Sequence, residues 1–170
     1  MEKVEEAEID KDSLSNVLTD AQALDLEEDT RDLKRCLVFE SGGLVMFIST
    51  EYITEIINDH NITPVPVVPN YVKGIINLRG SILPVVDIRL LMDKEPIEYT
   101  NRTCIIVLNI DSVPIGIIVD DVRSVLDIDN NAIQPLPLKK QQKLANGMLK
   151  LDDENETVAM SFDCEALINV

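Results

Sequence analysis

The chain has 170 residues and a mass of 19.0 kDa, which favours a single domain. Its 31 acidic and 15 basic residues give a net charge of −16, which argues against binding nucleic acid or gripping an anionic membrane. Aromatic residues are 4% of the chain, so the core must be aliphatic. No apolar run approaches the roughly 18 residues of a membrane span. The acidic N-terminus is unlike a secretion signal, and we expect a cytoplasmic protein without direct membrane insertion.

The composition changes near residue 35. Residues 1–35 hold twelve acids and five bases, and they lack Gly, Pro and aromatic residues. We therefore divide the chain into an acidic extension, residues 1–34, and a folded domain, residues 35–170. One amphipathic helix and disorder are equally consistent with the extension, because its acids surround a short apolar stripe at helical spacing. The stripe consists of Leu14, Val17, Leu18, Ala21 and Leu24.

From residue 36 onward the pattern is that of an all-β domain. Ile and Val supply 34 of these 135 residues, and β-branched side chains favour strands. Short apolar runs separated by turn signals predict three hairpins and two further strands. The hairpins pair 36–39 with 44–48, 74–76 with 82–86 and 104–108 with 115–119, and the further strands are 122–128 and 158–162. Helical turns are expected at 52–57, at 89–92 and after Asp163, a good N-cap.

Several of these runs are apolar at nearly every position, which indicates strands buried on both faces. Two small barrels packed against each other would bury both faces, whereas a sandwich with a wet outer face would show alternation. Pro84 inside a strand predicts an edge or a bulge. No internal repeat of fixed period is evident.

No catalytic constellation is recognisable in the sequence. His60 is the sole histidine and lies in a polar loop, where a solvated side chain is the plainer interpretation. Cys36, Cys104 and Cys164 are far apart and lie in apolar runs, so we interpret them as reduced core residues. We therefore expect a protein that is not an enzyme and has no metal site and no cofactor.

Two blocks of short motifs are much more specific. KGIINLRG at residues 73–80 is followed by PVVDIR at residues 84–89, and IGIIVDDV follows at residues 115–122. Together these motifs closely resemble the CheW-like family of bacterial chemotaxis coupling proteins. The resemblance covers roughly residues 35–170 and leaves the acidic extension outside.

The resemblance implies a fold and a function. The fold would be two packed five-stranded SH3-like β-barrels with a shared core and a few short helices. The function would be that of a non-catalytic scaffold in chemotaxis signal transduction. Such a scaffold couples the cytoplasmic tips of chemoreceptors (methyl-accepting chemotaxis proteins) to the regulatory domain of the CheA histidine kinase at membrane-associated receptor arrays. The alternative is a small all-β ligand-binding barrel outside chemotaxis, which the low aromatic content disfavours.

The resemblance also places partner contacts, with receptor or kinase, at six positions. These are Ile53, Glu55, Gly74, Arg79, Val122 and Val125. Each has a structural interpretation as well. Arg79 could serve in a salt bridge with Glu55, and Gly74 could meet a local backbone requirement. Val122 and Val125 could be ordinary core residues.

Overall fold

The computed structural model describes residues 30–58 and 61–170, which form two five-stranded sheets. The first sheet contains β1 (Leu33–Ser41), β2 (Leu44–Ser49), β8 (Asp121–Asp129), β9 (Ala145–Asp152) and β10 (Thr157–Phe162). The second contains β3 (Ile53–Ile57), β4 (Val72–Leu78), β5 (Ser81–Asp87), β6 (Cys104–Ile110) and β7 (Val113–Val119). The short helices are η1 (Thr50–Tyr52), α2 (Ile88–Leu91), η2 (Asn130–Ala132), η3 (Leu138–Lys140) and α3 (Cys164–Ile168). The predicted stripe at 14–24 and the loop around His60 lie outside the described residues.

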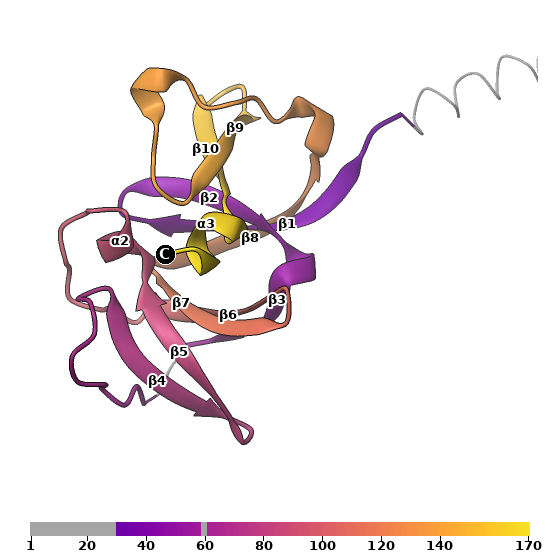
Figure 1. Ribbon diagram of the computed structural model, residues 1–170. Coiled ribbons are helices and arrows are strands. Elements are labelled where there is room, and N and C mark those ends of the chain that lie inside the picture. Colours follow the sequence, from indigo (N-terminus) through magenta and orange to yellow (C-terminus); the bar gives the residue numbers. More distant parts are fainter. Residues whose placement is uncertain (1–29, 59–60) are drawn as a thin grey trace, which may run out of the picture.

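Each sheet is closed into a barrel by one bridge formed beyond its edge strands. The first sheet, barrel A, has the order β8-β1-β2-β10-β9, and the second, barrel B, has the order β3-β6-β7-β5-β4. In barrel B, Thr63 pairs with Ile75 through two backbone hydrogen bonds of 2.9 Å. In barrel A, Gln134 pairs with Met148 in the same way. The two barrels form the two lobes of Figure 1, so the predicted fold of two packed five-stranded barrels is confirmed.

The chain contains an internal repeat whose two units exchange strands. The unit β1-β2-β3-β4-β5-α2 has the same order and the same pairings as β6-β7-β8-β9-β10-α3. Barrel A takes β1 and β2 from the first unit and β8 to β10 from the second, and barrel B takes the complementary strands. The register of strand pairing is also the same in the two units. Phe39 pairs with Val122 as Leu108 pairs with Ile53, and the equivalent residues of each strand are 69 positions apart.

The spacing between equivalent residues grows along the chain. It is 69 positions at Phe39 and Leu108, but 73 positions between Gly74 and Gly147, which precede the bridge-forming residues of β4 and β9. It is 76 positions between Asp87 and Asp163, the N-caps of α2 and α3. Unequal loops therefore hide the repeat from a search for a fixed period.

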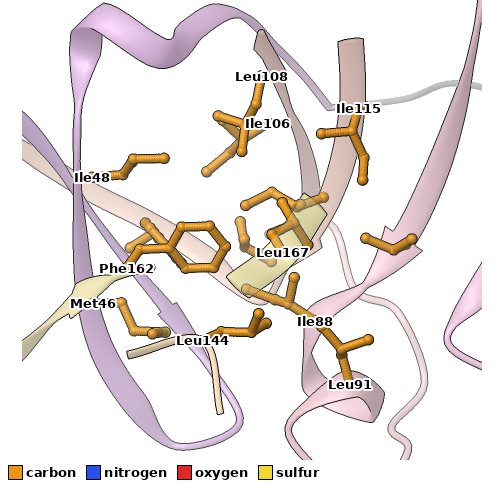
Figure 2. Packing of buried hydrophobic residues seen from close by; sticks show 14 of the residues in the cluster. Met46, Ile48, Ile88, Leu91, Ile106, Leu108, Ile115, Leu144, Phe162 and Leu167 are labelled. Atoms are coloured by element: carbon orange, nitrogen blue, oxygen red, sulfur yellow. The ribbon is translucent and has the colours of Figure 1, made fainter. Parts of the chain in front are cut away.

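Strands β1, β2, β6 and β7 are buried on both faces, as the sequence predicted. In β6, Ile105 and Val107 fill the interior of barrel B, whereas Ile106 and Leu108 point into a core between the barrels. The same alternation along β1 sends Val38 into barrel A and its neighbours into the shared core. Figure 2 shows side chains from both barrels meeting in this shared core.

One element prediction is wrong, and one strand was not predicted. The helical turn expected at 52–57 is replaced beyond Tyr52 by strand β3, because this β-branched run pairs with β6. Strand β9 was not predicted, since its Asn, Gly and Lys residues break the apolar pattern. The other predicted strands are present, and the helical turns at 89–92 and after Asp163 correspond to α2 and α3. Asp163 accepts a hydrogen bond of 3.1 Å from the backbone N–H of Ala166.

Pro84 lies at a local edge. Strand β5 lies inside its sheet, but its pairing with β7 begins only at Val85, so Pro84 has β4 as its pairing partner. The missing proline N–H therefore breaks no ladder hydrogen bond to β7.

The first strand, β1, begins at Leu33, two residues before the predicted start of the folded domain. The division of the chain at residue 35 stays a prediction.

Neither repeat unit can complete a barrel alone, because each barrel takes strands from both. We expect fragments 1–97 and 98–170, divided at the exposed Ile97, to lack cooperative unfolding when studied separately. Mixed in equal amounts, they should restore one cooperative transition in a denaturant titration followed by circular dichroism. Cooperative unfolding of monomeric fragment 1–97 would contradict the exchanged arrangement.

Candidate functional site

Ile53 and Glu55 lie on β3, an edge strand of barrel B, with a register shift between them. Ile53 pairs with Leu108 and packs against the shared core. Ile56 pairs with Ile106 and is 41% exposed. Both partners on β6 face the shared core, so the bulge puts Ile53 and Ile56 on the same face of the sheet. The edge of barrel B thus offers one anchored and one exposed isoleucine beside the junction of the barrels.

The edge strand β8 of barrel A has the same construction. Val122 pairs with Phe39 and packs against the shared core, and Val125 pairs with Leu37 and is 51% exposed. A register shift between these pairs puts Val122 and Val125 on one face, although three positions along a regular strand would separate their faces. Val122 is therefore a half-buried core residue and Val125 a surface residue.

The six predicted contact residues do not form one site. Strand β2 leads through η1 into β3, and β7 leads through the single residue Asp120 into β8. Strand β3 pairs with β6 at an edge of barrel B, and β8 pairs with β1 at an edge of barrel A, so the residues lie on the edges of two different sheets. We call Ile53, Glu55, Ile56 and Arg79 the β3 surface, and Val122 and Val125 the β8 surface. Sequence reasoning missed Ile56, which occupies in the first unit the place of Val125 in the second.

Arg79 links the β4–β5 turn to β3. Its Nη2 lies 3.4 Å from Glu55 Oε2, so the predicted salt bridge is present. The turn is fixed by the backbone N–H of Gly80, which donates to Asn77 Oδ1 at 3.0 Å. The Arg79 side chain is nevertheless 81% exposed, against 25% for Glu55. Glu55 Oε1 is buried without a hydrogen-bond partner in the described part of the chain. The exposed guanidinium of Arg79 therefore keeps donors available for a partner, whereas Glu55 is mostly covered.

Gly74 meets a backbone requirement of barrel closure. It has φ +145°, and a Cβ atom there would lie 2.1 Å from the carbonyl oxygen of Thr63. The adjacent residue, Ile75, forms the closing bridge with Thr63. A side chain at position 74 would push apart the two segments that close barrel B. Gly147 is similarly confined in barrel A, where a Cβ atom would lie 3.2 Å from the carbonyl oxygen of Gln134.

We expect Gly74→Ala to lower the free energy of unfolding by at least about 3 kcal/mol, because it combines a positive φ with a backbone clash. The matched control is Gly43→Ala, where φ is +76° and nothing lies within 4 Å of the added Cβ. That variant should cost about 1 kcal/mol. Urea titrations compare the two, and equal costs would contradict a role for Gly74 in closure.

Sequence reasoning also missed a polar contact that joins the barrels. Asp120 accepts hydrogen bonds from the Gly42 backbone N–H at 2.9 Å and from Arg89 Nε at 3.3 Å, and it forms an ion pair with Arg89. Gly42 lies in the β1–β2 turn of barrel A, and Arg89 lies on α2 beside barrel B. The side chains of Arg89 and Asp120 are 13% and 23% exposed. The signal in the sequence was the presence of Arg89 and Asp120 in two motifs that are otherwise mostly apolar.

Removing Asp120 would leave the guanidinium of Arg89 largely buried without its carboxylate. We therefore expect Asp120→Ala to cost about 3 kcal/mol of stability in guanidinium denaturation. The adjacent Asp121 provides the control, since it faces the exposed Arg102 at 3.7 Å. Asp121→Ala should cost less than about 1 kcal/mol. The role assigned to Asp120 fails if both variants are equally stable.

The cysteines show no features of reactive thiols. All three are unpaired, with Cys36 and Cys104 buried, as predicted, and Cys164 half-buried. Burial raises the pKa of Cys36 and Cys104, and it raises the pKa of Cys164 to about 12. These groups are protonated and weakly nucleophilic at neutral pH. Among residues 30–58 and 61–170, no group of His, Cys, Asp or Glu side chains is arranged to hold a metal ion. The helices of this part are too short or too polar to cross a membrane.

Comparison with known proteins supplies the family. The CheW-like domain matches residues 35–170. The chain belongs to the CheW-like family. It is 34% identical over 101 residues to the chemotaxis protein CheW of Klebsiella aerogenes, a match that covers 59% of this chain and 61% of that protein. It is 32% identical over 136 residues to the chemotaxis protein CheW of Bacillus subtilis, covering 80% of this chain and 87% of that protein.

A solved structure agrees with the two-barrel architecture. The scaffolding protein TtCheW from Thermoanaerobacter tengcongensis superimposes with a TM-score of 0.74 at 28% sequence identity. The match covers 81% of this chain and 94% of that chain. The fold implied by the sequence motifs is therefore that of a solved CheW-like protein.

Proposed function

We propose that this protein is a non-catalytic adaptor of bacterial chemotaxis that couples the cytoplasmic tips of chemoreceptors to the regulatory domain of the CheA histidine kinase. The observation that carries the proposal is the pair of equivalent edge strands, one on each of two barrels that share one packed core. An adaptor needs two surfaces that can be occupied together. The family supports this reading, since its relatives are named as chemotaxis and scaffolding proteins.

The two surfaces differ in chemistry, which suggests their partners. The β3 surface combines an exposed guanidinium, the Glu55 carboxylate paired with it and an exposed isoleucine. We assign this mixed surface to the receptor tip, where charges would set the register of binding. The β8 surface presents Val125 beside the shared core, and we assign it to apolar docking of the kinase regulatory domain.

The proposal places the protein in the cytoplasm, at receptor arrays on the membrane. The rival reading, a ligand-binding barrel, needs an internal cavity. Aliphatic side chains such as Ile76, Leu83 and Val107 fill the interior of barrel B, and Val38, Phe47 and Ile128 fill that of barrel A. The packed interiors favour the adaptor.

Two substitutions should distinguish the two proposed binding surfaces. Arg79→Ala should weaken binding of a receptor-tip fragment about tenfold and leave binding of the kinase regulatory domain unchanged. Val125→Ser should do the reverse, since it removes an apolar anchor from the edge strand of the other barrel. Isothermal titration calorimetry with each partner measures both affinities. Arg79→Lys should restore only part of the receptor affinity, because a point charge cannot replace a planar fork of donors.

Arg102→Ala is the matched control for Arg79→Ala, since Arg102 is also exposed and also faces one carboxylate, Asp121. It should change neither affinity. Both arginine variants should keep the unfolding free energy within about 1 kcal/mol of the parent. If Arg79→Ala unfolds the domain while its folded fraction binds normally, Arg79 is a structural strut. If Val125→Ser and Arg79→Ala weaken the same partner, the two-surface proposal fails.

A further inference from the structure

A groove of about 930 Å³ lies at the junction of the barrels, apart from the β3 and β8 surfaces. Equivalent parts of the two repeat units line it, namely α2 with α3 and the segments that precede β4 and β9. Both helices lie on the same side of the molecule in Figure 1. Leu90, Leu91 and Leu144 contribute to an apolar floor. The groove therefore offers contact area for an apolar segment.

The rim of this groove is basic in a strongly acidic protein. Lys73, Lys94 and Lys143 line it, whereas the whole chain has a net charge of −16. Lys143 pairs with Asp93 across 2.6 Å, and Asp93 is the acidic side chain of the lining. Lys73 and Lys94 have no ion-pair partner among the described residues. Two ammonium groups beside an apolar floor suit a segment that is both acidic and apolar.

The chain itself carries such a segment outside the described residues. Residues 1–29 contain eleven acids and two bases, and Leu14, Val17, Leu18, Ala21 and Leu24 recur at helical spacing among them. Covalent attachment gives this segment an effective concentration near the millimolar range, so even weak complementarity suffices for docking. The stripe ends at Leu24, and the six residue steps from Leu24 to Thr30 can span up to about 20 Å, which exceeds the radius of gyration of about 14 Å expected for the domain.

We propose that the acidic N-terminal segment, residues 1–29, docks in the lysine-rimmed groove between the barrels. Its apolar stripe would cover the leucine floor, and its carboxylates would face Lys73 and Lys94. This inference goes beyond the proposed function and does not depend on it. The groove lies beside Gly74 at the base of the β4–β5 hairpin, so docking would leave Arg79 at the tip of that hairpin free.

The test uses the full chain with a nitroxide attached at Gln22→Cys, a position off the apolar stripe. Cys164→Ser removes the half-buried native thiol, and Cys36 and Cys104 are buried. Paramagnetic broadening in NMR spectra should concentrate on backbone amides of the groove, including Lys94, Leu144 and Ala166. Raising the salt concentration from about 0.05 M to about 0.5 M should relieve the broadening, because the shorter Debye length screens the ion pairs.

Two sets of variants assign the contact. Replacing both Lys73 and Lys94 with Gln should lower the docked fraction about fivefold, since each lysine contributes one ion pair. The control replaces Lys139 and Lys140 of η3 with Gln, which removes the same charge from an exposed site outside the groove and should have no effect. The double variant Leu18→Ser and Leu24→Ser should also release the segment. It alters no residue of the folded domain, so it tests the contact even if the groove variant is unstable.

Three results would overturn the proposal. The first is the absence of broadening at the groove, which would leave this surface to another partner. The second is broadening that responds equally to the groove and control variants, which would indicate a diffuse attraction to any lysine. The third appears when the nitroxide-bearing chain is mixed with a separate isotope-enriched chain that carries no nitroxide. Broadening in the enriched chain would show that the segment docks on a second copy.

Discussion

The architecture depends on four strands that are apolar on both faces. β1, β2, β6 and β7 each need one layer of side chains inside a barrel and another layer between the barrels. Burying an aliphatic side chain contributes about 1.5–3 kcal/mol, so exposing either face of these strands would be costly. The chain meets the requirement by placing these four strands back to back and wrapping each pair with three strands of the other repeat unit. Two of the four edge strands, β3 and β8, carry the proposed contacts.

Much of this fold could be predicted from the chain because its signals are local. Alternating layers of Ile and Val, two-residue turns and the N-cap at Asp163 all act within a few positions. Strand β3 escaped prediction because only its pairing with β6, about 50 positions away, decides between a strand and a helical turn. The repeat escaped because backbone register preserves it while side chains differ. Phe47 in barrel A, for instance, stands where barrel B has Gly116.

The same difference between local signals and long-range pairing applies to the candidate site. The salt bridge of Arg79 with Glu55 could be anticipated, since a cation in a tight turn favours a carboxylate partner and the family resemblance named both residues as contacts. The bulges on β3 and β8 could not, because they depend on which residues oppose each other across distant strands. The contact of Asp120 with Arg89 required knowledge of the crossover from β7 to β8. The features that could not be predicted are therefore those that depend on how strands far apart in the chain pair with each other.

The exchange of strands between the units has a mechanical consequence. An adaptor of the kind proposed carries load whenever its two partners move relative to each other. In a chain of two independent domains, that load would fall on a linker and the domains would swing. Here, two of the chain's crossings between barrels run through η1 and through the single residue Asp120, and both barrels share one packed interior. Pulling the barrels apart would require extracting strands from both sheets, so the separation and orientation of the two edges stay fixed until the whole domain unfolds.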